Sequence, residues 1–319
     1  MQRRDFVAAL LGLATVQPVC AQQARAVGRI GLLDPGLPHL FAAFRDGMRE
    51  LGYVEGQSVE FLHRSANGQA DAIPALAHEL AGENVDVIVT AGPQAVRSMA
   101  KATSATPIVF AALGDALGTG LVDTLARPGR NLTGFSFLNT EMSAKRIELL
   151  TQAIPDARRI AVFYDPSSNP ASLDATEEAA RRLGLEVRVF PVSSSAAFED
   201  SFRAAVESSA RALDVLASPF FNSHRVRLVE LAAEHRVPAM YETAEYVQSG
   251  GLMAYGPSLP ELFRKAATYV DKILRGAKPS DLPVEQPTLF TLALNMRTAR
   301  TLGLVIPVSV LARADEVIE

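Results

Sequence analysis

Two stretches of the chain nearly repeat each other: Arg29-Ile30-Gly31-Leu32-Leu33-Asp34-Pro35 and Arg159-Ile160-Ala161-Val162-Phe163-Tyr164-Asp165-Pro166. Further similar pairs occur at the same interval: residues 50–53 and 182–185, 85–90 and 213–218, and 106–110 and 237–241. The interval is about 130 residues each time, the size of one domain. The repeat predicts two similar lobes, and a cleft between lobes is a favoured site for a small molecule.

Within each repeat, short apolar runs alternate with stretches of helical periodicity. In the first repeat we expect strands at 30–33, 59–63, 85–90 and 108–111, and helices at 40–51, 72–80 and 94–102. In the second we expect strands at 160–164, 187–190, 215–217 and 239–241, and helices at 143–153, 173–183, 198–209 and 225–235. Uniformly apolar strands are typical of parallel sheets covered on both faces. The pattern predicts an α/β protein with two Rossmann-like lobes, parallel sheets and a ligand cleft between the lobes.

The C-terminal part of the sequence predicts how the chain is divided between the lobes. Residues 131–138 and 252–255 are interpreted as crossings, and a helix at 262–274 is expected to return to the first lobe. A strand at 289–294 would rejoin the second lobe. We expect a first lobe of residues 27–137 plus 256–283, and a second lobe of residues 138–255 plus 284–319.

The first 26 residues have the layout of a secretory signal peptide. A basic start, Met1-Gln2-Arg3-Arg4, precedes an apolar run at 6–16 and small residues before Gln22. Arg3-Arg4-Asp5-Phe6 also fits a twin-arginine signal, so both export routes stay open. Cys20, the only cysteine, lacks the preceding leucine and small residue of a lipoprotein box. We therefore expect a periplasmic protein without a lipid anchor at Cys20.

Composition and motif spacing argue against several other classes of protein. The 319-residue chain has a formal net charge of −4 and no long Lys/Arg run, which gives no basic surface for nucleic acid. None of the five histidines has the spacing of a metal-ligand pair: His39, His63, His78, His224 and His235. Gly134-Phe135-Ser136-Phe137-Leu138 lacks the last glycine of a nucleophile elbow. We expect no catalytic residue, metal or cofactor, and a monomer that is not an enzyme.

The candidate site residues lie in the loops that follow the predicted strands, because ligands of open parallel sheets bind beyond the carboxyl ends of the strands. These residues are Pro35, Gly92, Pro93, Gln94, Asp115, Asn169, Asn222, Glu242 and Tyr255. Gly92-Pro93 predicts a helix start that leaves free amides for an anion, or simply a strand-to-helix turn.

The other candidates each have a structural alternative. Asp115 and Glu242 could bind an ammonium group, or could cap helices. Asn169 and Asn222 can both donate and accept, which suits an amphoteric ligand, but asparagine also caps helices. Tyr255 could stack on an apolar ligand or fill the core.

Several longer stretches carry a resemblance to a known family: residues 44–53, 85–89, 125–129, 251–256, 267–274 and 281–287. From Gly28 to Glu319 the chain resembles the substrate-binding proteins of ABC-type importers, in the TrpX-like group with a type I periplasmic-binding fold. The resemblance implies an exported receptor that closes on a small solute and docks on a membrane permease. Some relatives bind aromatic or branched amino acids, and many have a small hydroxyl residue where this chain has Gln94.

The resemblance also implies which loops face the ligand. Gly92, Pro93, Gln94 and Asp115 would do so from one lobe, and Asn169, Asn222, Glu242 and Tyr255 from the other. The expected function is capture of an amino acid or related carboxylate for an ABC permease. A ligand-binding sensor of a signalling system is the alternative, since it would share the fold and differ in its partner.

Overall fold

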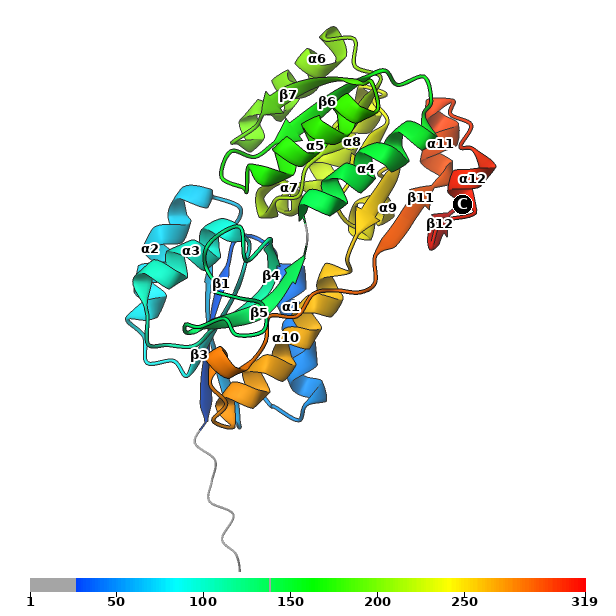
Figure 1. Ribbon diagram of the computed structural model, residues 1–319. Coiled ribbons are helices and arrows are strands. Elements are labelled where there is room, and N and C mark those ends of the chain that lie inside the picture. The colour runs from blue at the N-terminus through cyan, green and yellow to red at the C-terminus, as the bar shows by residue number, and fades with distance from the viewer. Residues whose placement is uncertain (1–26, 138) are drawn as a thin grey trace, which may run out of the picture.

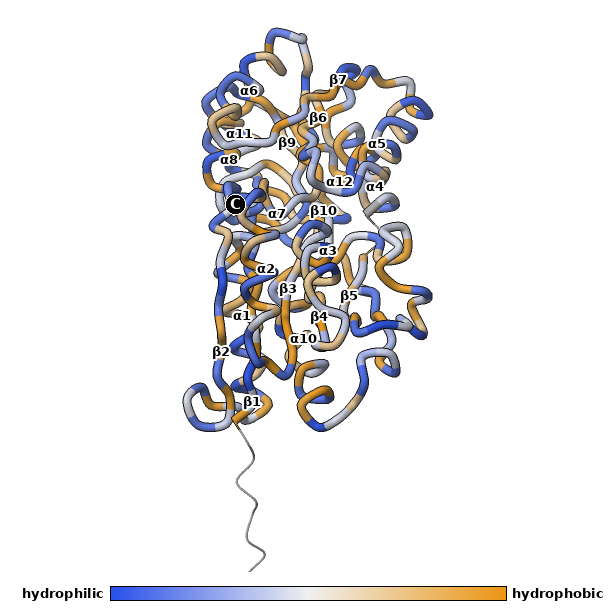
Figure 2. The backbone as a smooth tube through the Cα atoms, turned by 90° about the vertical axis from the view of Figure 1, so that its left-hand side faces the viewer, coloured by the Kyte–Doolittle hydropathy of each residue, from blue (hydrophilic) through white to orange (hydrophobic). Residues whose placement is uncertain are grey.

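The structure, a computed structural model, describes residues 27–137 and 139–319, which form two lobes (Figure 1). The predicted signal peptide, Cys20 and Leu138 lie outside these ranges. Each lobe has a sheet with helices on both faces. In Figure 2 the strands at the centre of each lobe carry mostly hydrophobic residues. Across the described residues, no helix combines the length and apolar character needed to cross a membrane.

The first sheet has five parallel strands: β1 (Gly28–Asp34), β2 (Val59–Ser65), β3 (Val87–Ala91), β4 (Ile108–Gly114) and β5 (Leu132–Phe137). Their order is β2-β1-β3-β4-β5. β3 is buried along its whole length, as its apolar sequence predicts. One face is covered by α2 (Ile73–Ala81) and α3 (Pro93–Ala102), and the other by α1 (Pro38–Glu50) and α10 (Leu259–Leu274).

The second sheet repeats this order as β7-β6-β8-β9-β10 and adds two strands beyond β10. Its strands are β6 (Arg159–Tyr164), β7 (Glu186–Pro191), β8 (Ala212–Val215), β9 (Ala239–Tyr241), β10 (Met253–Gly256), β11 (Thr291–Asn295) and β12 (Glu316–Ile318). Only the β10–β11 pair is antiparallel among the described pairs. The shared order confirms the internal repeat, and the α/β fold class predicted from the sequence is confirmed.

The helices of the second lobe also form two layers. They are α4 (Asn139–Ala153), α5 (Ala171–Arg182), α6 (Phe198–Glu207), α7 (Pro219–Ser223), α8 (Arg225–Glu234), α9 (Ala244–Gln248), α11 (Met296–Leu302) and α12 (Val308–Leu311). α4, α5 and α11 pack on one face of the sheet, and α6, α8 and α9 pack on the other. The predicted strand at 215–217 was placed too late: β8 begins at Ala212 and contains the buried Asp214.

The chain passes between the lobes after β5, after β10 and again before β11 (Figure 1). α10 begins at the Ser258 cap, whose hydroxyl accepts the Glu261 amide, and packs against α1 in the first lobe. The returning chain then pairs with the edge of the first sheet, since Glu285 bonds to Gly134 and Ser136. Residues 131–138 therefore contain a strand of the first sheet as well as a crossing. The exact lobe boundaries stay a prediction.

Candidate functional site

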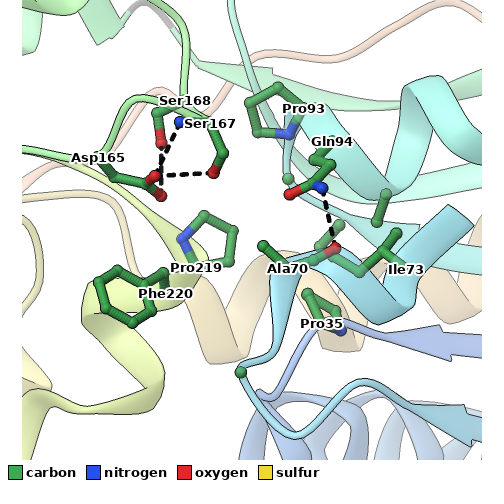
Figure 3. Close-up of a pocket in the computed structure, with 14 residues that line it drawn as sticks. Pro35, Ala70, Ile73, Pro93, Gln94, Asp165, Ser167, Ser168, Pro219 and Phe220 are labelled. Carbon is green, nitrogen blue, oxygen red and sulfur yellow. Dashed lines mark hydrogen bonds between the residues drawn. The ribbon is translucent and has the colours of Figure 1, made fainter. Parts of the chain in front are cut away.

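A pocket of two adjoining compartments lies between the lobes, at the carboxyl ends of the strands. The Glu242 compartment is lined by Leu37, Leu40, Ala91, Gly92, Pro93, Ala112, Gly114, Phe137, Ser168, Asn169, Ala217, Ser218, Pro219, Asn222, Glu242 and Leu259. The Gln94 compartment is lined by Pro35, Gly68, Ala70, Ile73, Ala91, Gly92, Pro93, Gln94, Ala95, Asp165, Ser167, Ser168, Pro219 and Phe220 (Figure 3). Residues from both lobes contribute to each compartment. This is where a doubly wound sheet is expected to bind its ligand.

Asn222 is the most informative polar residue of the Glu242 compartment. It lies on α7, is 1% exposed, and neither its Oδ1 nor its Nδ2 has a hydrogen-bond partner among the described residues. An amide buried without partners costs about 1–3 kcal/mol. A ligand that can both accept and donate would satisfy Asn222.

Glu242 places a carboxyl group in the same compartment. It follows β9 directly and is 6% exposed. Burial raises the pKa of Glu242 to about 7, although the positive charge of Arg146 acts in the opposite direction. A cationic group of a ligand would favour the ionised form and would offset the cost of burying it.

The start of α3 faces both compartments from the first lobe. Gly92, the residue before the helix, has φ +80°, and no side chain caps the helix start. Pro93 has no N–H, so the first free amides belong to Gln94 and Ala95. A helix of this length with an uncapped start favours an anionic group such as a carboxylate.

The remaining wall of the Glu242 compartment is apolar. Leu37, Leu40, Phe137 and Leu259 come from the first lobe and are each at most 6% exposed. Pro219 and Ala217 face them from the second lobe. This wall can take an apolar group of a ligand, while Asn222 and Glu242 bind its polar end. The sequence pattern did not single out these leucines, because their spacing is that of ordinary core residues.

The lobes touch at the pocket. A Cβ at Gly92 would stand 2.5 Å from Cγ of Pro219, and a Cβ at Gly68 would stand 2.9 Å from Oγ of Ser223. Nη2 of Arg97 also donates to the carbonyl of Ser167 at 3.5 Å. The described structure is therefore a closed arrangement, with glycines where the two lobes approach each other.

The Gln94 compartment is lined by groups whose hydrogen bonds are largely made. Nε2 of Gln94 donates to the carbonyl of Ala70 at 2.9 Å (Figure 3). The buried Asp165 accepts hydrogen bonds from Ser167, Ser168 and Ser218. These bonds fix the loop after β6 and leave fewer polar groups for a ligand than Asn222 and Glu242 offer.

Seven of the nine predicted site residues line this pocket. Gly92, Pro93, Asn169, Asn222 and Glu242 line the Glu242 compartment, and Pro35 and Gln94 line the other. Oδ1 of Asn169 accepts the amide of Ala171 at 3.1 Å, so this side chain also caps α5.

Asp115 and Tyr255 are not brought to the pocket. Asp115 has φ +49°, and its Oδ1 accepts the amide of Gly118 at 2.9 Å within its own turn. Tyr255 packs beside Phe290, with ring centroids 6.2 Å apart, against the core under α4. Their proposed contacts with the ligand do not fit this geometry.

With the fold and pocket in place, comparison with known proteins identifies the class. The chain belongs to the family of ABC transporter substrate binding proteins, whose model matches residues 31–318. That family description names binding proteins, not enzymes. A "Tyrosine-binding protein" of Clostridioides difficile (strain R20291) is 25% identical over 276 residues, covering 85% of this chain and 78% of the relative.

Two solved structures resemble this chain over nearly its whole length. A conserved domain protein from Vibrio cholerae is 27% identical with a TM-score of 0.84. An ABC domain from Streptococcus pneumoniae in complex with L-Trp is 26% identical with a TM-score of 0.82. Each match covers 92% of this chain and 100% of the other. The resemblance drawn from the sequence is confirmed.

Proposed function

We propose that this protein binds an amino acid with a large apolar side chain in the Glu242 compartment and delivers it to an ABC permease. One observation carries the proposal: two buried polar side chains, Asn222 and Glu242, line the same compartment as an apolar wall. That wall includes Leu37, Leu40 and Leu259. The tyrosine-binding relative and the L-Trp complex support an amino acid as the ligand class.

Each part of such a ligand has a counterpart in the pocket. The ammonium group would face the Glu242 carboxylate, and the carboxylate would meet the free amides at the start of α3. Asn222 would bond to either charged group, and the side chain would lie on the apolar wall. Affinity in the micromolar range corresponds to about −8 kcal/mol, which several charge-assisted bonds and one buried apolar group can supply.

The proposed mechanism is closure of a two-lobe clamp. Solute binds one lobe, rotation occurs near residues 135–138 and at Gly256, and the second lobe completes the contacts. A Cβ at Gly256 would stand 2.1 Å from the carbonyl oxygen of Glu242, so this crossing and the binding loop are packed directly together. The permease would select the closed, loaded form, a shift of population driven by differential affinity. Export to the periplasm and a monomeric state belong to the same proposal.

The test is calorimetry of the mature protein with L-tryptophan, L-tyrosine and L-leucine, preceded by release of any co-purified solute. Binding of at least one is expected, and Glu242→Gln and Asn222→Ala are each expected to weaken it about tenfold or more. A ligand analogue without the amino group, such as indole-3-propionate, should bind Glu242→Gln and the wild-type protein about equally. Full affinity in both variants would exclude this site.

A further inference from the structure

One fully buried cation lies behind the pocket. Arg146, on α4, is 1% exposed. Its Nη1 donates to the carbonyl of Tyr255 at 3.3 Å, and its Nη2 donates to Oγ of Ser143 at 3.1 Å. Its Nε has no partner among the described residues. A guanidinium stays charged even when buried, so it requires negative charge nearby.

Two carboxyl groups share the sheet face that α4 covers. Asp214 on β8 is aligned with Met240 on β9, which packs in the core beneath α4. Side chains on a strand alternate between faces, so Glu242, two residues after Met240, continues the same row. The positive charge of Arg146 lowers the pKa of both acids, although its hydrogen bonds within the described ranges go to Tyr255 and Ser143 and not to either acid.

The charges in this row do not balance when both acids are ionised. Asp214 is fully buried, and neither of its carboxylate oxygens has a partner among the described residues. One guanidinium can offset one carboxylate, which leaves a negative charge at Glu242, the acid that lines the pocket. The other charged or titratable groups near Glu242 are Glu245 and Tyr246 on α9, Arg225 on α8 and His39 on α1. Nη1 of Arg225 donates to the carbonyl of Asn222 at 3.5 Å, and Arg225 and Glu245 act in opposite directions on both His39 and Tyr246, so together they add no net charge. Burial lowers the pKa of His39, which favours its neutral form. The first-lobe wall opposite, Leu37, Leu40, Phe137 and Leu259, is uncharged.

We propose that Arg146 is a positioning residue of the binding site: its buried positive charge favours the ionised carboxylate of Glu242, and its hydrogen bond fixes the chain crossing at Tyr255, while the ammonium group of the ligand supplies the missing positive charge. The role of the ligand's ammonium group rests on the proposed function, whereas the role of Arg146 rests on its burial and hydrogen bonds. It adds a residue outside the pocket lining and predicts that binding expels a proton from Glu242.

The geometry also connects this cluster to both crossings. α4 starts at Asn139, immediately after the first crossing, and the carbonyl that Arg146 holds belongs to Tyr255, just before the second. Gly256, the next residue, packs on the carbonyl oxygen of Glu242. A change of charge at Glu242 therefore occurs beside the segments about which the lobes would rotate.

The first experiment needs no ligand. The carboxyl resonance of Glu242 is titrated by NMR in ¹³C-glutamate-labelled protein and assigned with Glu242→Gln. Arg146→Met is expected to raise the titration midpoint by about one pH unit or more, and Arg146→Lys to restore much of the wild-type value. Arg146→Gln makes the same test with a milder change if Arg146→Met does not fold. Thr176→Val, another buried polar substitution in the second lobe, is expected to leave the midpoint unchanged.

The second experiment uses L-tryptophan and L-tyrosine in calorimetry with two buffers of different ionisation enthalpy. Proton release is expected on binding near pH 6.5, with affinity of Arg146→Met about tenfold lower there and recovering near pH 9. A merely structural role would lower affinity equally at both pH values. An unchanged NMR midpoint in folded Arg146→Met or Arg146→Gln overturns the role of Arg146. If no amino acid binds the wild-type protein, the proposed function fails, while the NMR titration still decides the role of Arg146.

Discussion

Gly92 of the first lobe lies directly against the ring of Pro219 of the second. A Cβ at position 92 would stand 2.5 Å from Cγ of Pro219, closer than side chains approach in proteins, and Gly92 has φ +80°. The residue that opens α3 is therefore also the residue that lets the lobes meet. Closure and the free helix start depend on the same glycine.

Gly92→Ala is expected to weaken ligand binding about tenfold or more, because the added methyl group keeps the lobes apart. Gly92 has φ +80° and ψ 152°, a backbone region that is essentially restricted to glycine, so the alanine adds a stability cost of about 1–3 kcal/mol. Gly52→Ala is the matched control, since Gly52 has φ +86° and an added methyl group there would meet nothing within 4 Å. Both variants should lose stability in thermal unfolding, because both positions have positive φ, and only Gly92→Ala should lose affinity. Equal affinity in the two would contradict the role of this contact.

Ligand affinity is expected to fall as the pH is lowered through 7. The raised pKa of Glu242, about 7 in the ligand-free pocket, results mainly from burial. Binding an ammonium favours the carboxylate, so the pKa is lower in the complex. Affinity is thus at its maximum above the ligand-free pKa of Glu242 and decreases about tenfold per pH unit below it. Calorimetry of L-tryptophan between about pH 5.5 and 8.5 measures this, and Glu242→Gln should show a nearly flat profile.

Asp214→Asn is expected to stabilise the ligand-free protein at pH 8. Burial raises the pKa of Asp214 to about 6, above its ordinary value, despite the opposing charge of Arg146. When the pKa of a carboxyl group is higher in the folded state than in the unfolded state, the folded protein loses stability as the pH rises from the lower pKa to the higher one. The amide removes that loss, so its Tm should exceed the wild-type Tm at pH 8 and not at pH 4. A lower Tm at both pH values would contradict this prediction. It would show that the attraction between Arg146 and the Asp214 carboxylate stabilises the protein by more than the burial of that carboxylate costs.

Asp115→Ala is expected to leave ligand affinity within about twofold and to lower stability by about 1 kcal/mol. The carboxylate bonds to the Gly118 amide and the residue has φ +49°, so it holds its own turn, and it is not among the residues that line the pocket. Asp115→Asn keeps an acceptor and tolerates this backbone conformation, and it should lose less stability. Calorimetry and thermal unfolding measure the two effects. A large loss of affinity in both variants would place Asp115 in the site after all.

Much of the fold was predictable because most strands and covering helices of each lobe come from one continuous stretch of the chain, with α10 as the exception in the first lobe. The repeated Arg-Ile start of β1 and β6 and the apolar run of β3 and β4 predict parallel strands by pattern alone. β8 was misplaced because Asp214 interrupts its apolar sequence. That carboxyl lies on the sheet face that α4 covers, where the positive charge of Arg146 acts on it, and no local pattern contains this arrangement of distant residues.

The lining of the pocket was predictable where a loop directly follows a strand, as at Gly92 and Glu242. It was not predictable at Tyr255, because the ring of Tyr255 lies beside that of Phe290 against the core under α4, a contact between residues distant in the sequence. Leu37, Leu40 and Leu259 line the pocket with the same residue type that fills the core. Only their position opposite Asn222 and Glu242 distinguishes them.

The position of α10 in the sequence determines when the first lobe can finish folding. This helix packs beside α1, where the ring of Phe263 contacts that of Phe41, and covers the same face of the first sheet, yet it follows all of β6 to β10 in the chain. A ribosome or translocon that has released residues 27–137 alone would leave that apolar face uncovered. The first lobe therefore depends on a helix made about 120 residues after the last strand of its own sheet. A fragment ending at residue 137 should bind dyes such as ANS and aggregate, whereas adding residues 259–274 in trans should suppress both.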